Sequence, residues 1–227
     1  MSTGDQARAA ILSRIRGALG VSGRERSRET AVEDRLSRHP RGTIPARALG
    51  GRAALLQMMT AMLESQGAEV TKVGTPEEAV KAIEADLGAH GLPHELRLGS
   101  DPALVALPWS SASSLQLRSG RAAPQDRAGL SRAVAAAAET GTLFLASGVD
   151  NPTTLAFLPE VHFILVGAAD VVGSYEEGFD RLRAMHGEGG LPRTVNLISG
   201  PSRTADIEQT IVKGAHGPKR LHVVILG

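Results

Sequence analysis

The sequence predicts an α/β fold with a mostly parallel sheet and helices on both of its faces. Two observations support this prediction. From residue 51 onward, helix-like segments alternate with short apolar segments of strand character. Four of these apolar segments follow one another in the second half of the chain, with short loops and helix candidates between them. Such alternation is typical of parallel sheets, in which helices join successive strands and cover the sheet.

The first expected element is an amphipathic helix over residues 5–19. Its apolar residues recur at the spacing of one helical face, and Gly20 is suited to end it. A helix of this kind either packs on its own domain or acts as an arm that docks on a neighbour. The polar segment that follows favours the arm. The residues of the apolar face are Ile11, Leu12, Ile15, Ala18 and Leu19.

Residues 21–50 are predicted to be a linker with a solvated face of mixed charge. The segment is rich in Arg, acidic residues are interleaved with the arginines, and Pro40 and Pro45 break any helix. The interleaved acids offset the local field, so nucleic-acid binding is not expected here. The predicted organisation is an N-terminal helix and Arg-rich linker over residues 1–50, followed by an α/β domain over residues 51–227.

The α/β domain is expected to begin with a helix over residues 52–67. In the next helix Thr75 is the predicted cap and Pro76 the first helical residue. Residues 128–141 are predicted to be helical because they are rich in Ala, the strongest helix former. The other predicted elements are helices over 75–88, 101–107, 175–187 and 205–213, and strands over 68–73, 94–99, 142–147, 162–167, 193–199 and 221–226.

The composition excludes several classes of protein. The 227 residues include no Cys, so the chain carries no disulfide, thiolate nucleophile or Cys-ligated iron–sulfur cluster. A net charge of +1 and an aromatic content of 3% argue against nucleic-acid binding. No apolar stretch is long enough to span a membrane, and the seven His show no metal-binding spacing, so no metal site is expected. These features fit a cytoplasmic protein.

The first candidate site is the loop SGPSRT, residues 199–204. It follows a predicted strand and opens a predicted helix, so backbone N–H groups, hydroxyls and a guanidinium gather near a positive helix end. Ligands of parallel sheets bind beyond the carboxyl ends of the strands, where this loop is expected. The alternative is a capped turn in which Arg203 pairs with Asp206 or Glu208. The candidate anion-binding residues are Ser199, Gly200, Ser202, Arg203 and Thr204.

The second candidate site is the segment around Glu139, Gly141 and Thr142. Glu139 is expected at the carboxyl end of the alanine-rich helix, where a negative charge is unfavourable. This position makes Glu139 a candidate nucleophile or general base, with Gly141 and Thr142 as candidate ligand-binding residues. The alternative, which the pattern alone favours, is a solvent-exposed Glu in a tight turn formed by Gly141.

The third candidate site is the loop GAHGPKR, residues 214–220. His216 lies between glycines and is expected to be exposed, where it acts as an acid or base, donates to a phosphate or has no role. Lys219 and Arg220 are expected to be solvated caps of the last strand, and His162 a satisfied histidine at a strand end. The sequence has no Walker loop, no GxGxxG and no GxSxG elbow.

Three segments together resemble a known family. In chain order they are AETGTLFLAS, LPEVHFILVG and ISGPSRTADIEQTIVKGAHGPKRLHVVIL, and they are similar to the LutC/YkgG proteins, the lactate-utilisation C proteins of the LUD-domain family. The resemblance covers residues 130–227 strongly and the pattern from residue 51 more loosely. It implies a three-layer α/β/α sandwich of the NagB/RpiA/CoA transferase-like fold. It also implies a role in oxidising L-lactate to pyruvate, with two iron–sulfur proteins encoded alongside as partners.

The resemblance leaves three functions open. The leading expectation is a cytoplasmic subunit of a lactate-oxidising system that binds a small anionic ligand, a nucleotide-like cofactor or a partner surface through residues 199–204, Glu139 and His216. One alternative is a stand-alone transferase or isomerase acting on a phosphorylated or CoA substrate, because CoA transferases of this fold use a glutamate near a glycine. The other is a non-catalytic assembly or regulatory protein that works through residues 1–50. The sequence names no cofactor and leaves a homo-oligomer open.

Overall fold

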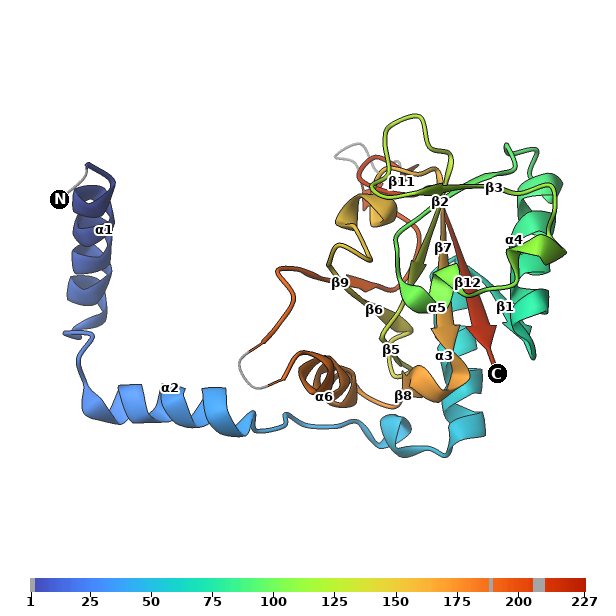
Figure 1. Ribbon diagram of the computed structural model, residues 1–227. Coiled ribbons are helices and arrows are strands. Elements are labelled where there is room, and N and C mark those ends of the chain that lie inside the picture. Colours follow the sequence, from blue (N-terminus) through green and yellow to red (C-terminus); the bar gives the residue numbers. More distant parts are fainter. Residues whose placement is uncertain (1–2, 188–189, 206–210) are drawn as a thin grey trace. The chain divides into compact units, whose positions relative to one another are not determined.

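The computed structural model describes residues 3–187, 190–205 and 211–227. It divides the chain into two compact units, Met1–Thr43 and Ile44–Gly227 (Figure 1). The first unit holds helix α1 (Thr3–Leu19), which confirms the predicted N-terminal helix, and helix α2 (Arg26–Arg38). Neither helix buries a residue. The apolar face of α1 is exposed, with exposed fractions of 61% at Ile11, 48% at Ile15 and 65% at Leu19.

Helix α2 corrects the prediction that residues 21–50 form a linker in which the prolines break any helix. Its charged residues stand at helical spacing, and the Arg38 guanidinium pairs with the Asp34 carboxylate one turn earlier. The helix ends at His39, which has a left-handed backbone and directly precedes Pro40. The interleaved acids and arginines thus support a helix as well as a solvated face, and proline breaks it only from residue 40 onward.

The second unit is built on a six-stranded sheet in which every neighbouring pair of strands is parallel. The strand order is β1-β12-β7-β4-β2-β3, so β12 lies between β1 and β7 inside the sheet. This arrangement confirms the predicted α/β fold with a mostly parallel sheet. The strands are β1 (Glu69–Val73), β2 (Glu95–Leu98), β3 (Gln116–Ser119), β4 (Ala128–Arg132), β7 (Val161–Gly167) and β12 (Arg220–Leu226).

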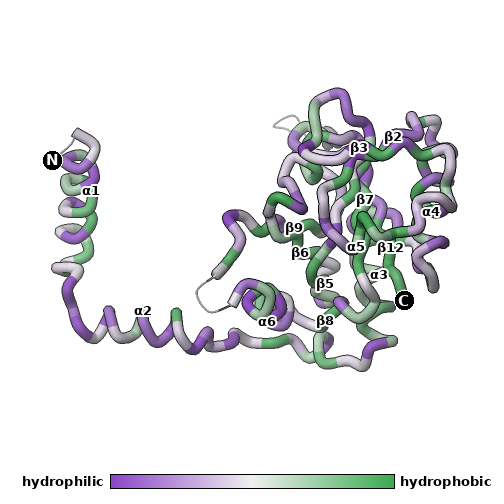
Figure 2. Tube along the Cα trace, in the orientation of Figure 1, coloured by the Kyte–Doolittle hydropathy of each residue, from purple (hydrophilic) through white to green (hydrophobic). Residues whose placement is uncertain are grey.

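One face of this sheet packs on helices α4 (Pro76–Ala89) and α5 (Pro102–Val105). Ile83 of α4 and Phe163 of β7 are fully buried members of the hydrophobic cluster between these layers. Figure 2 shows that β7 and β12 in this core are hydrophobic, whereas α2 of the N-terminal unit is mostly hydrophilic. Helix α4 begins with the predicted Thr75 cap, whose side chain and that of Glu78 form a reciprocal capping box.

The opposite face packs on helix α3 (Arg52–Ser65) and on a second, four-stranded sheet of order β8-β5-β6-β9. Helix α6 (Tyr175–His186) covers the outer side of this second sheet, where Phe144 meets Phe179 edge to face at 5.3 Å between ring centroids. The second sheet adds a layer that the sequence did not predict. Its strands are β5 (Ala135–Ala137), β6 (Thr142–Ala146), β8 (Val171–Val172) and β9 (Val195–Ile198).

The predicted alanine-rich helix over residues 128–141 is wrong, because this segment forms β4, β5 and a turn. Ala133 and Ala135 through Ala138 are fully buried between the layers of the domain. The backbone leaves the first sheet for the second, since Ala133 N donates to Leu165 O and Ala138 N donates to Val172 O. Small side chains let the two sheets approach closely, and this packing overrides the helix propensity of Ala.

The predicted helix over residues 205–213 is wrong at both of its described ends. There the chain forms β10 (Arg203–Ala205) and β11 (Ile211–Lys213), which pair antiparallel. The β-branched residues Thr204, Ile211 and Val212 favour strands. Residues 206–210 lie outside the described part of the chain. The remaining elements are the short 3₁₀ helices η1 (Ala46–Leu49), η2 (Trp109–Ser111), η3 (Thr153–Ala156) and η4 (Ala168–Asp170).

Candidate functional site

The two small-residue loops near the end of the chain lie side by side. Ser202 N donates a hydrogen bond of 2.9 Å to Pro218 O, and Gly214 N donates one of 3.0 Å to Ser202 O. The loop that follows β9 is thereby fastened to the loop that precedes β12. The first and third candidate sites of the sequence are therefore one place in the structure.

These two loops form the wall of a pocket of about 230 Å³, called pocket 1 here. Its other walls come from the end of β9, from the loop around Phe157 and from the beginnings of β7 and β12. Hydroxyl, imidazole and aliphatic groups share the lining, so the pocket offers hydrogen bonds within apolar surroundings. The lining residues used below are Phe157, His162, Ser199, Ser202, His216 and Leu221.

Pocket 1 lies at the amino ends of the strands of the parallel sheet. His162 and Leu221, which line it, are the second residues of β7 and β12. The expectation that the site lies beyond the carboxyl ends of these strands is therefore wrong for this pocket. Of the strands in the described part of the chain, only β9, a strand of the second sheet, directs its carboxyl end to the pocket, through Ile198 and Ser199.

His162 is a member of the pocket wall that sequence reasoning did not include. Its side chain is almost fully buried, and Nε2 lies 3.0 Å from the Ser131 hydroxyl. Burial lowers the pKa of His162 to about 3, so the imidazole is neutral near pH 7. The predicted satisfied histidine is confirmed by this contact. The one feature of the sequence that could have indicated a place for His162 in the pocket is its polar side chain directly before the apolar segment FILVG.

A cluster of four hydroxyl groups joins the second candidate site to pocket 1. Thr142 Oγ1 lies 2.8 Å from Thr140 Oγ1, 2.7 Å from the Tyr175 hydroxyl and 2.7 Å from Ser199 Oγ. A hydroxyl has one donor and two acceptor positions, so these three contacts use the full capacity of Thr142. Thr142 is fully buried and does not line pocket 1, but it fixes the side chain of Ser199, which does.

Glu139 and Gly141 occupy the turn between β5 and β6 rather than the end of a helix. The Glu139 carboxylate accepts a 2.8 Å hydrogen bond from Tyr175 N at the start of α6, and the residue is only 7% exposed. The alternative of a solvent-exposed Glu139 is therefore wrong. Gly141 has a φ of +66°, and a methyl group there would lie 2.8 Å from Met62 Cβ, so the turn tolerates only glycine. Glu139 lines neither pocket 1 nor its neighbour, pocket 2, described below.

Arg203 is brought to the same loop but not into pocket 1. Its guanidinium lies against the end of α3, where a methyl group on Gly67 would be 2.1 Å from Arg203 Nη2. Arg203 and Thr204 belong to strand β10, so the described residues beside Arg203 do not form the expected helix start. The expected pairing partners Asp206 and Glu208 lie outside the described residues, as does the side chain of Thr204. Gly200 packs on Gln66 and lines pocket 1.

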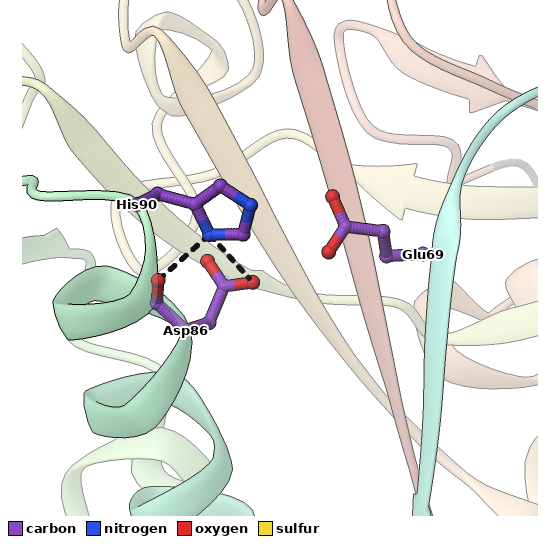
Figure 3. Close-up of side chains that lie close together, drawn as sticks. All are labelled: Glu69, Asp86 and His90. Carbon is purple, nitrogen blue, oxygen red and sulfur yellow. Dashed lines mark hydrogen bonds and ion pairs between the residues drawn. The ribbon is translucent and has the colours of Figure 1, made fainter.

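A second group of titratable residues lies on the far side of the sheet. The ligand atoms of Glu69, Asp86 and His90 lie within 4.8 Å of one another (Figure 3). However, Arg220 Nη2 donates to the Glu69 carboxylate at 2.7 Å and to the Asp86 carboxylate at 2.8 Å. The Arg220 guanidinium therefore already neutralises the two carboxylates that a metal cation would bind. Arg220 is an internal ion-pair partner, and the prediction that it is a solvated cap is wrong.

His222 completes this network. Its Nδ1 lies 2.9 Å from Asp86 Oδ1, and its Nε2 lies 2.8 Å from Thr71 Oγ1. Burial opposes the ionisation of Asp86, but the hydrogen bonds from His222 and Arg220 outweigh it and lower the pKa of Asp86 to about 2. The network ties α4 to β1 and β12 and does not touch pocket 1.

The comparison with known proteins identifies the family to which this chain belongs. The sequence profile of the LUD domain matches residues 56–226, and the chain therefore belongs to the LUD-domain family. Among the described residues, no helix is both long and apolar enough to cross a membrane.

Relatives with curated names confirm the predicted resemblance to the LutC group. Lactate utilization protein C of Deinococcus radiodurans is 34% identical over 134 residues, which are 56% of this chain and 61% of that protein. An uncharacterized protein of Neisseria meningitidis serogroup B is 40% identical over 99 residues, 44% of this chain and 42% of that protein. The chain thus covers less than two thirds of the length of each of these relatives.

A solved structure shares the fold. The crystal structure of a DUF162 family protein from Deinococcus radiodurans aligns with a TM-score of 0.58 and 24% sequence identity. The alignment covers 78% of this chain and 99% of that one. At this level of identity the likeness supports the α/β fold of the domain.

Proposed function

We propose that this chain is a component of a lactate-utilisation system and that pocket 1 binds a small organic anion such as L-lactate or pyruvate. The observation that carries the proposal is the joining of the two loops into one pocket, with Ser202 and His216 in its wall. The names of the curated relatives support the choice of lactate as the pathway.

The chemistry of pocket 1 suits a 2-hydroxy or 2-oxo acid. The hydroxyls of Ser199 and Ser202 both donate and accept hydrogen bonds, so they pair equally well with a ligand hydroxyl or carbonyl. Neutral His162 offers a further hydrogen-bonding group without adding charge. His216, which is exposed at the rim, is the imidazole available to donate to a carboxylate. Leu221 and Phe157 provide the apolar surface for a methyl group.

The proposed system includes iron–sulfur partner proteins. The chain has no Cys and so does not ligate such a cluster through thiolates. Electrons removed from lactate would therefore pass through clusters held by the partners. In this arrangement the chain contributes binding and orientation of the small acid, and the redox centres lie elsewhere in the system.

Growth on lactate tests the proposal. In a strain that lacks the native gene, the wild-type chain should restore growth on L-lactate, whereas Ser202→Ala and His216→Ala together should abolish it and leave growth on glucose unchanged. His186→Ala is the matched control, because His186 is an exposed histidine on α6 outside pocket 1. Growth of the double variant at the wild-type rate on lactate would show that pocket 1 is not the site.

A further inference from the structure

A second pocket adjoins pocket 1 and shares part of its wall. Pocket 2 has a volume of about 470 Å³ and lies between the segment 157–160 and the loop 214–219. Phe157, His216 and Gly217 line both pockets. The two pockets are therefore neighbouring compartments of one groove, with the Phe157 ring and the His216 imidazole where they meet.

Pocket 2 is lined by cationic side chains, whereas the described lining of pocket 1 has none. Among the described residues that line pocket 1, no Lys or Arg occurs and His162 is held neutral by burial. Pocket 2 is lined by Arg127 and Lys219, with Glu160 paired to both: Arg127 forms an ion pair with Glu160, and Lys219 Nζ lies 3.8 Å from Glu160 Oε1. One acid thus faces two cations.

The remaining acid in the lining of pocket 2 does not offset this excess. Asp126 accepts two hydrogen bonds from Arg97, at 2.9 Å and 3.1 Å. Arg97 itself lies outside the lining of pocket 2. The local charge of this compartment is therefore positive, and a ligand anion placed there gains a favourable interaction.

The side chain of Lys219 lies against the backbone of its own loop. Its aliphatic stem crosses Gly214, where a methyl group would lie only 2.3 Å from Lys219 Cγ. Gly214 also has a φ of +81°, which disfavours any other residue. The loop therefore requires glycine at this position, and Lys219 lines pocket 2 while remaining exposed to solvent.

We infer that this groove, besides holding the small acid alone in pocket 1, also accepts an elongated organic anion with two parts. A compact head, the 2-hydroxy or 2-oxo acid of the proposed function on which this inference rests, lies in pocket 1. A tail that ends in a carboxylate or phosphate lies in pocket 2 and contacts Lys219 and Arg127. Pocket 1 by itself is smaller than the range of about 300–1,000 Å³ typical of sites for larger organic ligands, whereas the groove as a whole falls within it.

Binding of matched acids to the purified full chain tests the inference. The probes are L-lactate, 2-hydroxyhexanoate, which adds an uncharged tail, and 2-hydroxyadipate, which adds a tail of the same length with a terminal carboxylate. We expect 2-hydroxyadipate to bind about tenfold more tightly than 2-hydroxyhexanoate in calorimetry, as for a charge-assisted hydrogen bond. Adipate, which has the tail but no hydroxyl, is the fourth probe.

Variants assign the gain to the groove. Lys219→Gln and Arg127→Gln together should remove the preference for 2-hydroxyadipate and leave the affinity for L-lactate unchanged. Lys72→Gln, an exposed lysine on β1, is the matched control and should keep the preference. Thermal unfolding of each variant verifies that it is folded.

Each outcome separates the inference from the proposed function. Equal binding of 2-hydroxyadipate and 2-hydroxyhexanoate, or a preference that survives in the double variant, overturns the two-part ligand while the small-acid site stands. Binding of adipate that depends on Lys219, without any effect of the 2-hydroxyl group, keeps the anionic compartment and removes the hydroxy-acid head. Failure of all four acids to bind overturns the groove, and the proposed function is then decided by growth of the Ser202→Ala and His216→Ala variant.

Discussion

The N-terminal unit and the LUD domain both contain a helix with an apolar stripe, but the stripe is exposed in the first unit and buried in the domain. In α3 of the domain, Met59 and Leu63 are fully buried, whereas Ile11 and Leu19 of α1 are 61% and 65% exposed. The units also differ in charge. The first 43 residues carry nine Arg and five acidic residues, whereas the rest of the chain carries 16 basic and 19 acidic residues.

This difference shows what helical periodicity does and does not determine. The apolar spacing of α1 predicts a helix, and a helix forms. The same spacing says nothing of what covers the stripe, since that depends on elements distant in sequence. An isolated helix of this length is only marginally stable in water. The difference in stability between α1 and α3 therefore depends on how much of their apolar surface is removed from solvent.

The largest expected effect is that of Leu63→Ala set against Leu19→Ala. Both changes remove the same atoms from a helix, but only Leu63 is part of a packed cluster. Leu63→Ala should lower the free energy of unfolding by about 2–5 kcal/mol, whereas Leu19→Ala should change it by less than about 0.5 kcal/mol. Urea denaturation followed by circular dichroism measures both. Equal losses would show that the stripe of α1 is as well covered as that of α3.

A smaller effect is expected when one ion pair from each unit is removed. Asp86 is buried against Arg220 and His222, whereas the pair between Asp34 and Arg38 is exposed on α2. The drop in the pKa of Asp86 from 3.8 to about 2 corresponds to about 2 kcal/mol of stability. Asp86→Asn should cost at least that amount, and Asp34→Asn about 0.3–0.5 kcal/mol.

The pH dependence of unfolding gives this prediction a sign. The folded pKa of Asp86 lies below its unfolded value, so its contribution is fully present above about pH 4 and is lost as the pH falls toward 2. Unfolding measured between pH 6 and pH 2 should therefore show a component that Asp86→Asn lacks and Asp34→Asn keeps. Parallel curves for wild type and Asp86→Asn would contradict the assigned network.

The smallest effect is expected from removing the whole N-terminal unit. The buried hydrophobic clusters consist of residues from 59 onward, and α1 and α2 bury no residue. A chain that begins at Ile44 should keep its unfolding free energy within about 0.5 kcal/mol of the full chain. Calorimetry of the two chains makes the comparison. A loss of several kcal/mol would mean that the unit contributes to the core of the domain.

Local rules predicted the elements whose stability is local. Thr75 and Pro76 correctly predicted the start of α4, and the β-branched segments correctly predicted β7 and β12. Helix caps and strand propensity act over a few residues, so they can be recognised locally. The segment 128–138 was predicted wrongly, since its structure is decided by burial between two sheets that come from the rest of the chain.

The candidate site divides in the same way. Residues 199–202 and 214–217 were recognised in the sequence as candidates because their loops are rich in small residues, which is a local property of the chain. Nothing local in the sequence revealed Arg127 or Phe157, and the only local signal for His162 was its polar side chain at the start of FILVG. Each of the three joins the groove through the pairing of β7 with its neighbours or through the packing of loops. The guanidinium that looked most like an anion ligand, Arg203, lies against α3 instead.

The place of β12 has a consequence for how the chain can reach its fold. Thr71 of β1 and His222 of β12 are in contact although they are 151 residues apart in sequence. Since β12 separates β1 from β7, the central sheet cannot assemble in its final order before residues 220–226 leave the ribosome. Until then, β1 and β7 each present an unpaired edge, which other chains can bind. Nascent chains of this protein should therefore depend on chaperones that shield strand edges.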